Sequence, residues 1–247
     1  MRNWPKTTDE SKKRWNKNAD FWDNKMGEHS NRFHREIVRP STEELLKVNV
    51  GEEILDIACG NGNFSRRLAD LGAKVTAFDY STNLIENAKK RCSLYLDKIK
   101  FKVIDATNYN LLIDLGIESF DKAVANMALM DISDIEPLLS SVYKLLKPKG
   151  IFVFSIMHPC FQPPKMRKII ETEDLGGKIE TTNSIQIFNY ITPQCFEGNA
   201  IAGQPVPQLY YHRPLSELLE QCFKTGFVVN GLKEPVFNAD KEEWNEI

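Results

Sequence analysis

The sequence predicts an α/β protein with a doubly wound, mostly parallel β-sheet. Between residues 53 and 156, five short apolar runs alternate with amphipathic helical segments, and turn residues such as Gly72 separate them. Residues 151–156 are apolar on both faces, which is typical of a parallel strand that helices cover on both sides. The predicted strands are 53–57, 74–78, 100–104, 121–125 and 151–156.

Polar side chains stand at or near the ends of four of these strands, namely Asp56, Asp79, Asp105 and Asn126. The carboxyl ends of parallel strands meet at one edge of a sheet, and ligands bind beyond that edge. We therefore expect these four side chains to converge on one site.

With 247 residues, the chain has the length of one large domain or of a domain with an elaboration. We expect a single domain, 1–247, in four parts: a helical N-terminal cover (1–48), a cofactor-binding core (49–157), an insertion or substrate lid (158–212), and a C-terminal helix and strand (213–247). Aromatic residues of the cover are Trp15, Phe21, Trp22 and Phe33.

Local signals place several element boundaries. Ser41 with Glu44, and Ser133 with Glu136, have the spacing of capping boxes that open helices. Ser81 is a predicted N-cap. The insertion is rich in proline and glycine, with one strand-like run at 184–191. Residues 226–231 predict a sixth strand.

The composition narrows the class of protein. Hydrophobic residues make up 42% of the chain and charged residues 27%, as in globular proteins, and the net charge of -2 gives no sign of nucleic-acid binding. The five cysteines are widely spaced, the N-terminal segment has no apolar signal region, and no apolar run reaches membrane-spanning length. We expect a cytoplasmic protein that binds neither membrane nor nucleic acid.

The turn after the first predicted strand indicates a nucleotide site. Gly60 and Gly62 begin a Gly-x-Gly-x-x-Gly pattern, but Ser65 is an imperfect third member. Asp56, four residues before Gly60, would repel a pyrophosphate and suits a ligand that carries an ammonium or sulfonium cation. A nicotinamide-dependent oxidoreductase remains an alternative that explains the turn and Asp79.

These residues resemble the class I S-adenosylmethionine-dependent methyltransferases, nearest to small-molecule enzymes of the ubiquinone/menaquinone-biosynthesis type. Asp56 to Gly62 looks like the family's first motif, with Ala58 where glycine is commoner. Asp79 looks like the residue that binds the ribose diol, and Asp105-Ala106 like the pair that reads the adenine amine. The resemblance implies S-adenosyl-L-methionine as cofactor, a small-molecule methyl acceptor, and binding by Asp56, Ala58, Cys59, Gly60, Asn61, Gly62, Asp79, Tyr80, Asp105, Ala106, Asn126 and Met127. We expect no metal, because His158 and Cys160 are two residues apart and no second pair of ligands follows.

Two histidines are candidate catalytic residues. His158 directly follows the fifth predicted strand, and we interpret it as a general base or an acceptor-positioning group, or else as a loop histidine bonded to backbone. His212 closes the insertion and either faces His158 or caps the next helix. Because no catalytic base is unmistakable, a non-catalytic cofactor-binding regulatory protein is a second alternative.

Relatives usually carry a seventh strand beside the fifth, and no such run follows residue 232. Either the insertion donates that strand, the chain stops short of it, or the sheet edge is bare. A bare edge would favour pairing with a second copy of the chain, so a homodimer is among the expectations.

Overall fold

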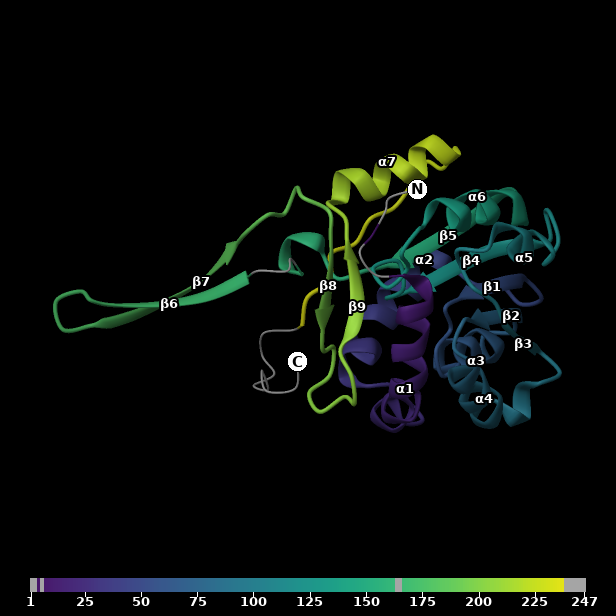
Figure 1. Ribbon diagram of the computed structural model, residues 1–247, viewed down its shortest axis with the longest axis horizontal. Helices are drawn as coiled ribbons and strands as arrows, with labels where there is room; N and C mark the ends of the chain where they lie inside the picture. The colour runs from purple at the N-terminus through teal and green to yellow at the C-terminus, as the bar shows by residue number, and fades with distance from the viewer. Residues whose placement is uncertain (1–3, 5–6, 163–165, 238–247) are drawn as a thin grey trace.

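The computed structural model describes residues 4, 7–162 and 166–237. Its centre is a five-stranded sheet in the order β3-β2-β1-β4-β5 (Figure 1). Each neighbouring pair in this sheet is parallel. The strands are β1 (Glu53–Ile57), β2 (Lys74–Asp79), β3 (Ile99–Val103), β4 (Phe120–Asn126) and β5 (Leu146–Ser155). The chain builds the sheet outward from β1 to β3 and then adds β4 and β5 on the other side of β1. This strand order confirms the predicted doubly wound fold.

Helices cover both faces of this sheet because successive β1 side chains point to opposite faces. Leu55 and Ile57 pack into a cluster with α5, α6 and α7, whereas Ile54 packs into a second cluster with α2 and α3. The helices are α2 (Arg39–Leu46), α3 (Asn63–Asp70), α4 (Thr82–Arg91), α5 (Tyr109–Ile113), α6 (Glu136–Leu145) and α7 (Leu215–Thr225), with 3₁₀ turns at Ser93–Tyr95 and Pro159–Phe161.

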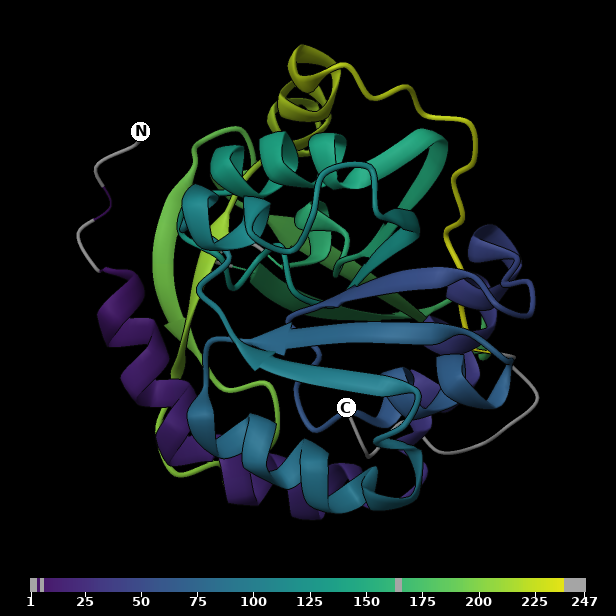
Figure 2. The same ribbon diagram turned by 90° about the vertical axis from the view of Figure 1, so that its right-hand side faces the viewer.

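The N-terminal segment is helical, as predicted. Helix α1 (Thr8–Met26) begins at Thr7, whose hydroxyl oxygen accepts a hydrogen bond from the Glu10 backbone N–H. Helix α1 lies beside α4 (Figure 2). A π-helical turn (His34–Val38) then runs directly into α2.

Both predicted capping boxes are wrong, whereas the Ser81 cap is confirmed. Ser41 lies inside α2, which begins at Arg39 and directly follows the π-helical turn. A capping residue bonds the free N–H groups at the start of a helix, and Ser41 is not at such a start. The Ser133 hydroxyl pairs with Thr8 instead, and the first N–H of α6, at Glu136, donates to the Asp134 Oδ1 at 3.2 Å. The Ser81 hydroxyl does accept a hydrogen bond from the Leu84 N–H at 3.2 Å.

The insertion forms two antiparallel hairpins. Strands β6 (Met166–Asp174) and β7 (Ile179–Ile187) pair along their whole length and project away from the rest of the molecule (Figure 1). Strands β8 (Gln194–Gly198) and β9 (Gln208–His212) form the second pair. The predicted run at 184–191 overlaps only the end of β7, because exposed strands lack the apolar alternation by which strands are recognised.

The predicted strand at 226–231 is wrong. Gly226 ends α7 in a left-handed conformation, and the chain continues without strand pairing to the end of the described residues. The Phe227 ring packs against the rings of Phe152 and Tyr143. The insertion hairpins do not join the central sheet, so β5 is its edge strand among the described residues. The polar segment 238–247 lies outside the described residues.

Within the part of the chain that the structure describes, no helix combines the length and the apolar character needed to cross a membrane.

Gly62 provides a test of the close packing between the first loop and α4. It has φ +78°, and a Cβ there would lie 3.0 Å from the Ala88 Cβ and 3.2 Å from the Cys92 Sγ. We expect Gly62→Ala to lower the free energy of unfolding by about 2–4 kcal/mol, from left-handed strain plus overpacking. Urea unfolding measures this change.

Gly51 is the matched control, because its φ is +86° and nothing lies within 4 Å of a Cβ built there. Gly51→Ala should cost only the backbone strain, about 1–2 kcal/mol. Equal losses in the two variants would contradict the packing role of Gly62.

Candidate active site

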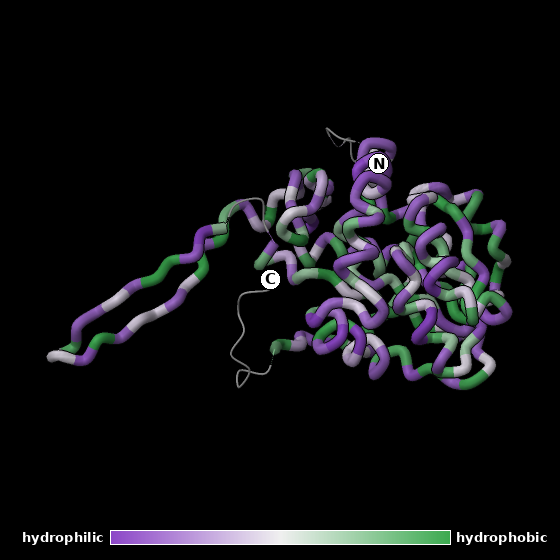
Figure 3. The backbone as a smooth tube through the Cα atoms, turned by 90° about the horizontal axis from the view of Figure 1, so that it is seen from below, coloured by the Kyte–Doolittle hydropathy of each residue, from purple (hydrophilic) through white to green (hydrophobic). Residues whose placement is uncertain are grey.

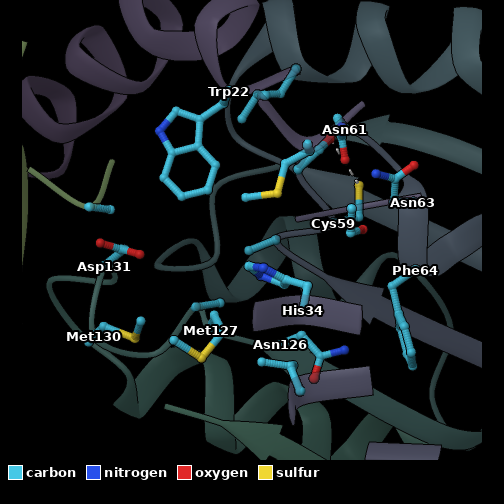
Figure 4. A pocket seen from close by; sticks show the side chains of 18 of the residues that line it. Trp22, His34, Cys59, Asn61, Asn63, Phe64, Asn126, Met127, Met130 and Asp131 are labelled. Carbon is cyan, nitrogen blue, oxygen red and sulfur yellow. Dashed lines mark hydrogen bonds between the residues drawn. The ribbon is translucent and has the colours of Figure 1, made fainter. Parts of the chain in front are cut away.

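A large cavity lies at the carboxyl edge of the sheet, with a volume of about 1420 Å³. Its walls come from the loops after β1, β2, β3 and β4, from α1 and the π-helical turn, and from the β8–β9 hairpin (Figure 4). The predicted convergence of the strand ends is therefore present. Predicted cofactor residues in the wall are Asp56, Ala58, Cys59, Gly60, Asn61, Asp79, Tyr80, Asp105, Ala106, Asn126 and Met127.

The loop after β1 turns by placing alternate residues in the left-handed region. Ala58, Gly60 and Gly62 have φ values of +52°, +56° and +78°. Gly60 faces open space, with nothing within 4 Å of a Cβ position, so a ligand can approach its backbone closely. Gly62 differs from the other predicted cofactor residues, because it packs on α4 and is not in the cavity wall.

Asp79 ties this loop to the end of β2. Its carboxylate accepts hydrogen bonds from the Gly60 N–H at 3.1 Å and the Ser81 N–H at 2.9 Å. Burial raises the pKa of Asp79 to about 6, although these bonds favour the ionised form. Each oxygen keeps a lone pair for a ligand hydroxyl.

Asp56 is buried beneath the same loop. The Ser65 hydroxyl donates a hydrogen bond to its Oδ2 at 2.6 Å. Burial, with a smaller contribution from the charge on Asp79, raises the pKa of Asp56 to about 7. Both carboxyl groups therefore favour a nearby cation, which would lower the two pKa values and offset the cost of burying the charge.

Asp105 and Asn126 are held in fixed orientations. The Asp105 Oδ1 accepts hydrogen bonds from the Thr107 N–H and hydroxyl, both at 2.8 Å. The Asn126 Oδ1 accepts hydrogen bonds from the Thr42 hydroxyl at 2.8 Å and the Ser155 hydroxyl at 3.1 Å. This amide oxygen therefore links β4 to α2 and β5.

Helix α1 is fastened over the cavity by polar contacts. The Asn61 amide donates a hydrogen bond to Asp23 at 3.1 Å, and Arg91 forms an ion pair with the same carboxylate at 2.5 Å. The Tyr80 hydroxyl lies 2.9 Å from the Ser11 hydroxyl oxygen. The aromatic cover lies in the cavity wall at Trp15, Trp22 and Phe33, but not at Phe21.

Asp131 is a wall residue that we did not single out from the sequence. Its Oδ1 is buried without a hydrogen-bond partner among the described residues, and its carboxyl group lies across the cavity from Trp22 (Figure 4). Burial raises its pKa well above the usual range, and a hydrogen bond from Gln208 offsets this only in part. The available signal was a carboxylate five residues beyond the end of the fourth strand.

Arg213 positions the loop that carries Asp131. Its buried guanidinium donates hydrogen bonds to the carbonyl oxygens of Leu129, Ile132 and Ser133 at 3.3, 2.9 and 2.7 Å. The Tyr211 N–H donates a hydrogen bond to the Met130 carbonyl at 2.7 Å. The end of the insertion is thus bonded to both sides of Asp131.

Neither predicted catalytic histidine is in the cavity wall. The Nδ1 of His158 accepts a hydrogen bond from the Cys160 N–H at 3.2 Å, which is the alternative of a loop histidine bonded to backbone. His212 is buried, and its Nε2 donates to the Tyr190 carbonyl at 2.7 Å. Their catalytic role stays a prediction without support from this geometry, because backbone bonds hold both rings outside the cavity.

His34 does lie in the wall, on the π-helical turn. Its Nδ1 is 2.8 Å from the Asn31 amide oxygen. Burial lowers the pKa of His34 to about 4, so the ring is neutral near pH 7.

Comparison with known proteins is consistent with this geometry. A family model described as a methyltransferase domain matches residues 49–212. The chain is 32% identical over 117 residues to a demethylmenaquinone methyltransferase of Tropheryma whipplei (strain Twist), covering 47% of this chain and 46% of that protein. It is 28% identical over 132 residues to a malonyl-[acyl-carrier protein] O-methyltransferase of Salmonella typhimurium, covering 50% and 47%. The chain thus matches about half the length of these curated relatives.

A solved structure agrees over more of the chain. An S-adenosylmethionine-dependent methyltransferase from Mesorhizobium loti aligns with a TM-score of 0.63 and 25% identity, covering 78% of this chain and 81% of that chain.

The protein belongs to the methyltransferase domain family, because the family match spans most of the chain, from the residues just before β1 to the end of β9. The resemblance to class I S-adenosylmethionine-dependent methyltransferases is confirmed, and S-adenosylmethionine is the cofactor. The cavity fits this group: Gly60 leaves room for close approach, Asp79 can accept from hydroxyls, and buried carboxyl groups favour a cationic ligand. The residue assignments for cofactor binding stay predictions.

The raised pKa of Asp56 leads to a pH-dependent prediction. The native pKa is about 7 against a usual 3.8, so the native state holds this proton more tightly than the unfolded state. Asp56 therefore lowers stability as the pH rises through that interval. We expect Asp56→Asn, which keeps an acceptor for Ser65, to be about 1–4 kcal/mol more stable than the wild type near pH 8.

Urea unfolding of the ligand-free protein at a series of pH values measures the difference. It should shrink towards zero below about pH 3, where the wild-type carboxyl group is protonated in both states. A gain of the same size at both ends of the range would attribute the effect to packing instead.

Proposed function

We propose that this protein transfers the methyl group of S-adenosylmethionine to a small-molecule acceptor by in-line displacement. The observation that carries the proposal is the cavity, whose volume of about 1420 Å³ exceeds the ~300–1,000 Å³ typical of a site for one ligand. Its wall combines the strand-end residues with the large apolar and aromatic side chains of Trp22, Met130, Phe196 and Tyr210. This arrangement supports a cofactor and an acceptor bound side by side.

The protein's main task in such a reaction is positioning. When bound, the cofactor supplies an activated methyl group on a sulfonium. Asp79 and the β1 loop would hold the cofactor, while α1 and the β8–β9 hairpin would exclude water and hold the acceptor. Holding two reactants in a productive geometry lowers a barrier by about 7–11 kcal/mol.

Asp131 is the proposed proton acceptor for a hydroxyl or amine of the methyl acceptor. Asp131 lies in the cavity wall, and its Oδ1 has no hydrogen-bond partner among the described residues. Its raised pKa makes its carboxylate form a stronger base than an ordinary carboxylate. His34 is the rival base in the wall, but its pKa of about 4 makes it a weak one.

We place this activity in the cytoplasm. The five cysteines are free in the structure, which supports a reducing compartment. The acceptor is expected to be a metabolite and not a nucleic acid or a membrane, in line with the net charge of -2.

Isothermal titration calorimetry with S-adenosylhomocysteine and with NAD tests the cofactor and separates the methyltransferase from the oxidoreductase alternative. We expect binding of the former and none of the latter. Asp79→Ala should weaken S-adenosylhomocysteine binding at least tenfold, because it removes charge-assisted hydrogen bonds. Gly51→Ala, far from the cavity wall, is the control and should bind as the wild type does. Heat with NAD alone would refute the proposal.

Asp131→Asn tests the proton acceptor. The measurement is labelled-methyl transfer from S-adenosylmethionine into the small-molecule fraction of a cell extract, with mass spectrometry of the product. We expect turnover to fall by about 10²–10⁴-fold, with S-adenosylhomocysteine affinity unchanged. His34→Gln is the matched control and should retain most of the turnover.

Two outcomes count against these assignments. Equal losses in the Asp131 and His34 variants would argue against Asp131 as the base. No transfer by the wild type, despite normal S-adenosylhomocysteine binding, would favour the non-catalytic regulatory alternative.

A further inference from the structure

The hairpin of β6 and β7, here called the arm (residues 166–187), has two chemically different faces. Residues directly opposite one another in an antiparallel pair share a face. The register Met166↔Ile187, Lys168↔Ile185, Ile170↔Asn183 and Asp174↔Ile179 therefore defines one face. That face carries five apolar residues (Met166, Ile170, Ile179, Ile185 and Ile187) beside Lys168, Thr172, Asp174, Thr181 and Asn183, and it is called the apolar face. The other face carries one apolar residue, Ile169, beside Arg167, Glu171, Glu173, Glu180, Thr182, Ser184 and Gln186.

The apolar face is exposed to solvent in the single chain. Ile170 is 61% exposed, Ile179 69% and Ile185 49%. The arm extends away from the body, and both hydrophobic and hydrophilic stretches occur along it (Figure 3). An isolated two-stranded hairpin is marginally stable in water, and an exposed apolar face of this kind marks an interaction site.

Two opposite charges on the apolar face indicate which partner can bind there. Lys168 lies near the base of the arm and Asp174 near its tip, both on β6. We propose that the apolar face binds the same face of a second copy of this chain, with the two arms antiparallel about a twofold axis.

The antiparallel arrangement pairs opposite charges and brings one pair of isoleucines together. A twofold axis that crosses the arms sideways sets β6 against β6 and β7 against β7. Lys168 then meets Asp174 of the partner subunit, and at the same level Ile185 meets Ile179 of the partner subunit. Both contacts occur twice by symmetry. A parallel arrangement would bring Lys168 and Asp174 opposite isoleucines instead.

The size of the arm sets the expected strength. Its strands have nine residues each, so the face is about 30 Å long. Such a contact buries well under the ~800 Å² per partner of a standard stable interface. The dimer should therefore be weak and reversible, forming at micromolar concentrations and above.

Sedimentation velocity on the full-length chain tests the contact, over about 1–300 µM. We expect a monomer–dimer equilibrium in the wild type and a monomer throughout for Ile170→Glu. Thr182→Glu adds the same charge to the opposite face and should dimerise like the wild type. A wild type that stays monomeric, or equal behaviour of the two variants, would overturn the proposal.

A charge exchange tests the register. Lys168→Asp and Asp174→Lys should each weaken the dimer at least tenfold, and the double variant should restore it. Asp174 also accepts a hydrogen bond from the Gly177 N–H in the arm's turn. If Asp174→Lys weakened the dimer only by loosening this turn, adding Lys168→Asp would not restore dimerisation. Failure of the double variant to dimerise, with unchanged circular dichroism, would refute the antiparallel pairing.

Discussion

Three carboxyl groups lie in the wall of one cavity, and burial raises the pKa of each: Asp56, Asp79 and Asp131. The placement of Asp56 and Asp79 follows from the parallel sheet, because every parallel strand delivers the residues at its carboxyl end to the same edge. Burying carboxyl groups together opposes ionisation and costs stability in the empty protein. The same arrangement makes the cavity favourable to a cation, which is the property that a sulfonium ligand requires.

The cavity becomes an enclosed site only through segments distant in sequence. Helix α1 is fastened to the β1 loop through Asp23, which contacts both Asn61 and Arg91. The opposite wall depends on Arg213, which holds the loop after β4 through its carbonyl oxygens. These polar contacts decide which side chains of α1 and of the loop after β4 line the cavity.

The insertion has two separate roles in this picture. Its β8–β9 hairpin contributes to the cavity wall, whereas the arm reaches that wall only at its first residue, Met166, and otherwise extends away from the body. The proposed dimer uses the arm, so substitutions towards its tip can alter association without changing the cavity wall. This separation also accounts for the absence of a seventh strand beside β5 among the described residues, because the inserted strands pair with one another instead.

The sequence by itself determined the central sheet, α1, the Ser81 cap and the gathering of Asp56, Asp79, Asp105 and Asn126 in one wall. These features are local or periodic, and parallel topology converts strand ends into a shared edge without further information. Tertiary structure alone decided that Ser133 pairs with Thr8 and does not cap α6, and that residues 226–231 pack through Phe227 without forming a strand. It also decided that His158 and His212 are bonded to backbone outside the cavity while Asp131 faces into it. Most of these features depend on contacts with residues more than 20 positions away in the sequence. The spacing of neighbouring residues does not indicate which distant residues will be in contact.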